Sequence, residues 1–360
     1  MAAGFAQVSA QLDPERFRGQ IQGRTVRLLT LRSEHLQASI CTHGARLLQL
    51  WVPDFSGQRR DVVLGHDSLP QLLSGMSSMG AFVGRFANRI AGARYRHAGA
   101  WVQLPANDGP HTLHGGPGGS RHRVFDVLQH TPDQLSLGLT FTEADDGFPG
   151  EVDLQVHFRL NGATLEVSHE ARVRESDSPL NFTFHPFFNL QGEGSVMGHQ
   201  LQIEADHFLP VDAQRIPLGH LAPVQGTAFD FRQAVRLDRA HAHNDPQVRL
   251  GVAPGFDHAW VTDLQSGGWH RQARLFAPAS GIGMEVWSDA PGVQFYSGLA
   301  MDGTLPRHAG KGGQTYSRYA GLCLEPQHLP DAPNQPLLGT CMHRPGSVVR
   351  GRMAFSFRTG

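Results

Sequence analysis

The stretch EVDLQVHFRLNGATLEVSHEARV, residues 151–173, places the strongest constraint on how this chain folds. Apolar and polar residues alternate over 152–160, and the alternation resumes over 163–167 after Asn161-Gly162. Successive side chains of a strand point to opposite faces, so a period of two predicts a strand with one buried face. A two-residue Asn-Gly between two such segments is the strongest short signal of a β-hairpin. The segment therefore predicts an antiparallel sheet with one face on the core.

The same alternation continues along most of the chain. It recurs in TVRLLTLRS (25–33), QLSLGLTFTEA (134–144), HQLQIEADHFLPV (199–211), GMEVWSDAPGVQFYSG (283–298) and RMAFSFRTG (352–360). Helical periodicity is scarce, and SLPQLLSGM (68–76) is the one segment expected to form a short helix. The 42 glycines and 23 prolines are dispersed, which favours many tight turns over a linker. We therefore predict an all-β protein built as one large antiparallel β-sandwich.

The length of the chain is compatible with a single folding unit. Large all-β folds reach the 360 residues present here without dividing into domains. No internal repeat or low-complexity tract marks a boundary. We predict a single domain over residues 21–360, preceded by a flexible N-terminal extension over residues 1–20.

Charge and cysteine content exclude several classes of protein. The net charge of −1 gives no basic footprint for nucleic acid or anionic lipid. Cys41, Cys323 and Cys341 are widely spaced and odd in number, which indicates a reducing compartment rather than a disulfide framework. We see no secretory signal in the first residues and no apolar run of membrane-spanning length. The expected protein is soluble and cytoplasmic, with no nucleic-acid or membrane partner.

Two residues could carry proton-transfer chemistry. Glu325 follows the apolar run GLCL, at the mouth of a loop that prolines stiffen. Held against apolar neighbours, its carboxylate would gain a raised pKa and become a useful base; alternatively it points to water. His185 lies in the aromatic run NFTFHPFFNLQG, where Pro186 indicates a strand edge or a bulge. On spacing alone, a core histidine with satisfied hydrogen bonds is favoured there.

Other polar residues lie beside glycines or at strand ends. GRFANRI (84–90) and TLHGGPGG (112–119) combine arginine, asparagine or histidine with backbone that permits close approach of a polyol. Arg85 and Arg89 are equally compatible with ion pairs. His111 and His114 form an HxxH pair, which is a weak metal signal without a helix or a nearby glutamate.

Two strands carry further candidates. Asp257 in GFDHAWV either accepts hydrogen bonds from a ligand or caps a turn, and the cap is slightly favoured locally. Gln294 in PGVQFYSG faces either solvent or a ligand.

Taken together and in order, seven motifs resemble the aldose 1-epimerase (galactose mutarotase) family. They are GRFANRIAGARY, LHGG, FHPFFNLQG, FLPVDAQRIPLGHLAPVQGTAFDFR, FDHAWV, GMEVWSDAPGVQFYSG and GLCLEPQHLPDAPNQP, and they extend from about residue 40 to the C-terminus. The resemblance implies a supersandwich-like fold that binds a free aldose as a monomer or homodimer and needs no metal or cofactor. It implies Glu325 as the catalytic base and His185 as the catalytic acid. The sugar-contacting positions that it implies are Asn88, Arg89, His114, Asp257 and Gln294.

The implied reaction moves two protons on neighbouring oxygens. A base removes the proton of the C1 hydroxyl while an acid protonates the ring oxygen, the ring opens, and reclosure on the other face gives the other anomer. Burial is expected to raise the pKa of Glu325, and its charge is expected to keep His185 protonated. Such positioned groups contribute roughly 10²–10⁴-fold each.

The resemblance has departures, and other functions compete with it. Phe184 and Phe187 stand where the family commonly has asparagine and tyrosine, and Leu299 stands where it has asparagine. A hexose-6-phosphate 1-epimerase on the same fold would need phosphate-binding cations, for which Arg121 and Arg123 are the candidates. A non-catalytic sugar-binding protein, or a glycoside hydrolase using Glu325 and Asp257, are further alternatives.

Overall fold

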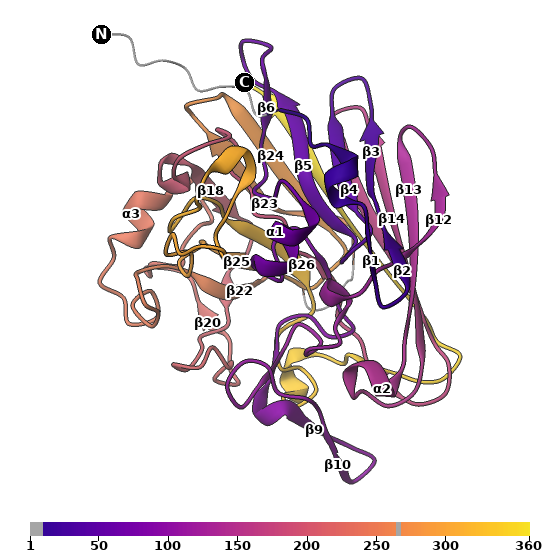
Figure 1. The fold of residues 1–360 in the computed structure, drawn as a ribbon. Coiled ribbons are helices and arrows are strands. Elements are labelled where there is room, and N and C mark those ends of the chain that lie inside the picture. The colour runs from indigo at the N-terminus through magenta and orange to yellow at the C-terminus, as the bar shows by residue number, and fades with distance from the viewer. Residues whose placement is uncertain (1–9, 264–267) are drawn as a thin grey trace.

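Three large antiparallel sheets form the framework of the molecule (Figure 1). A computed structural model describes residues 10–263 and 268–360. Strands dominate the ribbon, and the few helices are short, as the alternation of the sequence predicted. The prediction of a large antiparallel β-sandwich is confirmed.

The largest sheet has nine strands in the order β12-β13-β14-β15-β28-β24-β23-β18-β21. In that order the strands span Asp126–His130, Gln134–Phe141, Val152–Asn161, Thr164–Val173, Val348–Thr359, Ile282–Ser288, His270–Ala277, Gln200–Ile203 and Val235–Arg236. The predicted hairpin is β14–β15, with Asn161 paired to Thr164 across its turn. Along β14 every second residue from Val152 to Leu160 is buried.

Two smaller sheets complete the framework. The five-stranded sheet has the order β20-β19-β22-β25-β26, spanning Ala222–Pro223, His207–Phe208, Asp257–Val261, Gly292–Tyr296 and Cys323–Gln327. The four-stranded sheet has the order β3-β4-β5-β6, spanning Leu28–Arg32, Gln37–Cys41, Arg46–Pro53 and Arg59–Asp61.

Short strand pairs and single helical turns connect the sheets. The pairs are β1 (Gly19–Ile21) with β2 (Arg24–Val26), β9 (Arg94–His97) with β10 (Ala100–Gln103), β8 (Arg89–Ile90) with β11 (Thr112–Leu113), β7 (Phe82–Val83) with β17 (Thr183–Phe184) and β16 (Ser178–Pro179) with β27 (Met342–His343). The α-helices of the described residues are α1 (Leu69–Ser74), α2 (Glu143–Asp146) and α3 (Leu237–His241). The 3₁₀ turns of the described residues are Pro14–Phe17, Ala91–Ala93, Ser120–His122, Val196–Gly198, Lys311–Gly313 and Pro336–Leu338. The short helix expected within residues 68–76 is α1, capped by Ser68.

One apolar cluster joins the three large sheets. It includes Leu47 of β5, Leu154 of β14, Phe355 of β28 and Trp260 of β22, all with at most 1% of their surface exposed. Burying such side chains contributes about 1.5–3 kcal/mol each. Because this cluster is continuous across the three sheets, we propose that residues 21–360 form a single domain.

The N-terminal segment differs from the prediction over part of its length. Residues 1–9 of the expected extension lie outside the described residues. Residues 10–20 pack on the sandwich: Phe17 is fully buried and Leu12 is 5% exposed, in a cluster with Leu48 of β5. The Leu12 amide also donates to Gln49 Oε1 at 3.2 Å. The two apolar side chains explain why this part is not loosely held.

Membrane insertion through a helix has no candidate in the described part of the chain. The α-helices there are a few residues long, and none combines the length and apolarity that crossing a bilayer requires.

Candidate active site

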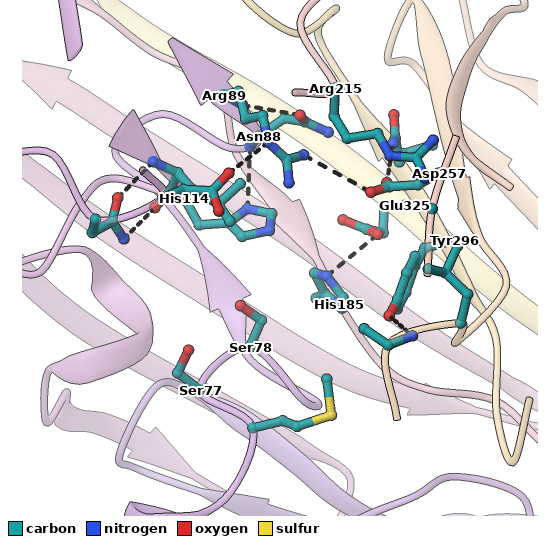
Figure 2. Close-up of a pocket in the computed structure, with 18 of the residues that line it drawn as sticks. Ser77, Ser78, Asn88, Arg89, His114, His185, Arg215, Asp257, Tyr296 and Glu325 are labelled. Atoms are coloured by element: carbon teal, nitrogen blue, oxygen red, sulfur yellow. Dashed lines mark hydrogen bonds and ion pairs between the residues drawn. The ribbon is translucent and has the colours of Figure 1, made fainter. Parts of the chain in front are cut away.

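Four separate parts of the fold meet at one pocket (Figure 2). Strands β22, β25 and β26 lie side by side, and their pairing sets Gln294 directly opposite Glu325. His185 follows β17, which contacts β26. The loops around β8 and β11 close the other side. The pocket has a volume of about 580 Å³, within the usual range for a small-molecule site.

All seven residues that the sequence nominated line this pocket. They are Asn88, Arg89, His114, His185, Asp257, Gln294 and Glu325. The further lining side chains that sequence reasoning did not select include Ser77, Ser78, Asp108, Arg215, Tyr296 and Arg307. Arg215 and Tyr296 lie inside two of the motifs, and the other four residues lie outside all of them. No local pattern distinguishes any of the six from its neighbours, so the assembled fold identifies them.

Asn88 and His114 hold each other in place. The Asn88 amide donates to His114 Nδ1 at 3.1 Å, and the His114 amide donates to the Asn88 carbonyl at 3.0 Å. Both residues have left-handed backbone, with φ of 64° and 56°. Non-glycine residues adopt this conformation at a cost, and it persists where surrounding contacts over-determine it. The bond at Nδ1 places the ring proton of neutral His114 on Nε2.

Steric crowding explains why glycine follows His114 in the LHGG motif. Gly115 has φ +77°, and a Cβ there would lie 2.3 Å from the carbonyl oxygen of Gly84. A side chain at this position would push the His114 loop away from the strand region that carries Asn88. The glycine therefore permits close packing of the two backbone segments, whereas the predicted approach of a polyol stays a prediction.

Arg89, Asp257 and Gln294 form a hydrogen-bonded set along one wall. Arg89 Nε donates to Asp108 at 2.8 Å, and Arg89 Nη1 lies 3.9 Å from Asp257 Oδ2. Gln294 Nε2 donates to Asp257 Oδ1 at 2.7 Å. Burial would raise the pKa of Asp257, but Arg89, Arg215 and Gln294 outweigh it and hold that pKa below its ordinary value. Asp257 is therefore a stable carboxylate, and the local prediction of a turn cap is wrong.

Glu325 and His185 face each other at the bottom of the pocket. His185 Nε2 lies 3.4 Å from Glu325 Oε1, and their side chains are 7% and 2% exposed. The His185 ring stacks on Phe187, with centroids 5.3 Å apart, and meets the His114 ring edge-on. His185 Nδ1 and Glu325 Oε2 are buried with no hydrogen-bond partner among the described residues. Aromatic packing thus fixes the His185 ring, and each residue of the pair has a polar atom left over for a ligand.

Burial changes the protonation expected for this pair. Burial, reinforced by the charge of Asp257 and opposed by Arg89, raises the pKa of Glu325 well above its ordinary value. Burial also lowers the pKa of His185 to about 4, although the nearby Asp257 carboxylate opposes this shift. The expectation that a neighbouring carboxylate keeps His185 charged is wrong, because desolvation outweighs the carboxylate's effect on the His185 pKa. Desolvation therefore favours a proton on Glu325 over a proton on His185.

One group of three side chains in the described ranges has the spacing of metal ligands. Ligand atoms of His185, Cys323 and Glu325 lie within 4.8 Å of one another. A cation there would have to displace the Cys323 proton, since burial raises the pKa of that thiol. The HxxH pair does not act together: His111 Nδ1 accepts from the Gly92 amide, and His114 Nδ1 accepts from Asn88.

Three departures from the family pattern have different positions. Phe184 is fully buried in the main apolar cluster, away from the pocket. Phe187 and Leu299 both line the pocket. The first acts by packing on His185, and the second places an apolar surface where a polar side chain is usual.

The sandwich and its pocket define a galactose mutarotase-like β-sandwich protein. Solved structures agree: a GalM/aldose epimerase homologue from C. elegans matches with a TM-score of 0.85 at 29% identity, covering 92% of this chain and 98% of that one. A galactose 1-epimerase from Lactobacillus acidophilus matches with a TM-score of 0.80 at 26% identity, covering 95% and 97%.

Sequence comparisons identify the family. The aldose 1-epimerase family model matches residues 27–356. The galactose mutarotase of Homo sapiens is 40% identical over 341 residues, which cover 93% of this chain and 95% of the relative. The aldose 1-epimerase of Escherichia coli is 35% identical over 340 residues, which cover 93% and 96%. The chain belongs to the aldose 1-epimerase family, a family of isomerases.

Proposed function

We propose that this protein interconverts the α and β anomers of a free aldose such as galactose or glucose, with Glu325 and His185 as the proton-transfer pair. The contact of 3.4 Å between His185 Nε2 and Glu325 Oε1, inside a buried pocket, carries this proposal. The C1 hydroxyl and the ring oxygen of a pyranose share one carbon, so both can face one such pair. Galactose is proposed because the relative from Homo sapiens is a galactose mutarotase. Glucose is a second aldose whose pyranose ring presents the same C1 hydroxyl and ring oxygen.

The shared proton suits the reaction in both directions. As the sugar binds, the proton resting on Glu325 passes to His185 across their contact, which leaves a carboxylate facing the C1 hydroxyl. Glu325 then takes the C1 hydroxyl proton while His185 protonates the ring oxygen. The ring opens to the aldehyde, the C1–C2 bond rotates, and closure on the other face reverses the two roles. Asn88, Arg89, His114, Asp257 and Gln294 hold the remaining hydroxyls, so that orientation adds to acid–base catalysis.

The direct test is a panel of free sugars at substoichiometric protein. Exchange between anomers is measured by NMR exchange spectroscopy, which separates enzymatic from spontaneous interconversion. Acceleration of at least one aldose supports the proposal. If no free hexose or pentose exchanges faster than it does in buffer, the proposal is wrong.

The rate of anomer exchange should depend on pH with a bell shape. The pair works while it holds one proton. Below the pKa of His185, about 4, both groups are protonated and the base is lost. Above the raised pKa of Glu325 both are deprotonated and the acid is lost. The two apparent pKa values of this profile belong to the Glu325–His185 pair as a whole and not to either residue alone. The measurement is kcat/KM from pH 3.5 to 9, corrected for the spontaneous rate, with circular dichroism at each pH as the control for folding. A flat profile over this range would contradict the assignment.

The rival phosphate-sugar function has weaker support. Arg121 lines the pocket, but its Nε donates to His122 and its Nη1 donates to Ser78 Oγ. Arg123 is absent from the lining and pairs with Asp145 at 3.0 Å. Only one of the two candidate cations therefore faces the site. Comparing glucose with glucose 6-phosphate in the same exchange assay separates the two functions.

We also propose an oligomeric state and a cellular location for the protein. The site is built from one chain, so a monomer or each half of a homodimer would hold it complete. Cys41, Cys323 and Cys341 are all free and buried, which supports the proposed cytoplasmic location.

A further inference from the structure

Within the described part of the chain, four pocket residues have a buried polar atom without a hydrogen-bond partner. Three belong to the proposed machinery: His185 Nδ1, Gln294 Oε1 and Glu325 Oε2. The fourth is Nη1 of Arg215, which lies in the FLPVDAQRIPLGHLAPVQGTAFDFR motif but is not among the sugar-contacting positions expected from the sequence. Buried polar groups are normally paired, and leaving one unpaired is unfavourable. In a ligand site such atoms mark the groups that a ligand satisfies.

The loop that carries Arg215 is held in a fixed shape. The Asp212 carboxylate accepts from the amides of Gln214 and Ile216, at 2.8 and 3.0 Å. The Arg215 amide donates to the Asp212 carbonyl at 3.0 Å, and Arg215 itself has left-handed backbone with φ +67°. The Gln214 side chain accepts from His111 Nε2 at 2.9 Å, which ties the loop to the opposite wall. The strained position of Arg215 is therefore imposed by its neighbours.

A glycine makes room for the Arg215 guanidinium. A Cβ at Gly251 would lie 2.8 Å from Arg215 Nη2 and 3.0 Å from Leu299 Cδ1. The guanidinium and the Leu299 side chain thus meet over the bare backbone of Gly251. Leu299 has no polar atom to offer at this part of the wall, and Arg215 supplies donors there.

The charge of Arg215 acts on the site. It is one of the groups that hold the pKa of Asp257 below its ordinary value, and Figure 2 shows the two side chains beside each other. Arg89 differs from Arg215 in its hydrogen bonding, because Arg89 Nε already donates to the Asp108 carboxylate. A guanidinium is a donor only, so its partner must be an acceptor oxygen.

We infer that Arg215 is a specificity-determining residue that donates a hydrogen bond to a sugar oxygen at the edge of the ring beyond Asp257. This inference rests on the proposed function. The acceptor is a hydroxyl away from the reacting C1, so Arg215 selects among aldoses and takes no part in proton transfer.

The inference is tested by combining a substitution in the enzyme with the removal of single hydroxyls from the substrate. Wild type and Arg215→Leu are assayed for anomer exchange with D-galactose and its 2-, 3-, 4- and 6-deoxy derivatives. A hydrogen bond from a charged donor corresponds to roughly tenfold to hundredfold in kcat/KM. We expect Arg215→Leu to lose this factor on galactose, and wild type to lose it on one deoxy sugar. The variant should lose nothing more on that same sugar.

Two further variants sharpen the experiment. Gly251→Ala displaces the guanidinium and should reduce the preference for the same hydroxyl. Arg249→Leu makes the matched change at an exposed position near Gly251 and outside the lining, and should leave every rate unchanged. Thermal melting controls for folding of each variant.

The outcomes are distinguishable. If Arg215→Leu lowers the rate by one common factor on all five sugars, Arg215 is structural and the inference is wrong. If wild type and variant are equal throughout, it is also wrong, while the proposed function stands. If wild type accelerates none of the free sugars tested, the proposed function itself fails.

Discussion

Replacing Glu325 by glutamine is expected to lower kcat for anomer exchange by about 10²–10⁴-fold. The substitution keeps the shape of the side chain and removes the group that exchanges protons. His185→Asn should have an effect of similar size. Because both residues serve one concerted transfer, the double variant should lose little more than either single one, as is usual for residues that act as a unit.

Controls separate this result from loss of folding or of binding. Glu34→Gln changes an exposed glutamate, 85% accessible, and should retain the wild-type rate. Each variant is checked by thermal melting and by sugar binding in calorimetry. Single variants that exchange galactose and glucose at the wild-type rate would disprove the assignment. Fully additive losses would show that the two residues act in separate steps.

Replacing Arg85 by methionine is expected to destabilise the protein by about 3–5 kcal/mol. Arg85 donates to both carboxylate oxygens of Asp146, each at 2.9 Å, and neither side chain is exposed. Its guanidinium also contacts the rings of Phe141 and Phe148. The variant leaves Asp146 buried without its cation, and the urea midpoint should fall accordingly.

The destabilisation should shrink as the pH falls. Burial already raises the pKa of Asp146 to about 6 although Arg85 opposes it, and without Arg85 that pKa rises further. The folded variant then binds a proton that the unfolded chain binds only near pH 4, so its stability improves relative to wild type as pH falls from 7 to 5.

Two further substitutions serve as controls for the predicted effect of Arg85→Met. Arg350→Met breaks an exposed pair with Glu170, whose side chains are 69% and 35% accessible, and should cost less than about 1 kcal/mol. The double variant Arg85→Met with Asp146→Leu should recover much of the loss, because no unpaired charge remains. A loss for Arg85→Met no larger than that of the surface control would contradict the argument.

The sequence predicted the architecture because its signals were local. The alternation around Asn161-Gly162 specified a hairpin with one buried face, and β14 and β15 follow it. The short helix within residues 68–76 was also predicted by a local pattern. The prediction of a flexible extension is wrong for residues 10–20, because Phe17 and Leu12 pack against partners such as Leu48 and Gln49, which lie 30 residues or more away.

Motifs nominated the residues of the site, but local spacing could not assign their roles. On spacing alone His185 reads as a core histidine and Asp257 as a turn cap. Only the assembled fold sets His185 against Glu325 and ties Asp257 to Gln294. Arg215 lies in a motif that gave no sign of its role, because that role depends on the bare backbone of Gly251.

By itself the sequence determined an antiparallel all-β fold, the residue types available for proton transfer and their order along the chain. Tertiary structure alone decided which of them share a pocket and in which direction burial shifts their pKa values. The reason is that strand alternation depends on neighbours a few residues apart. Desolvation, by contrast, depends on every atom packed around a group, and here it raises the pKa of Glu325 and lowers that of His185.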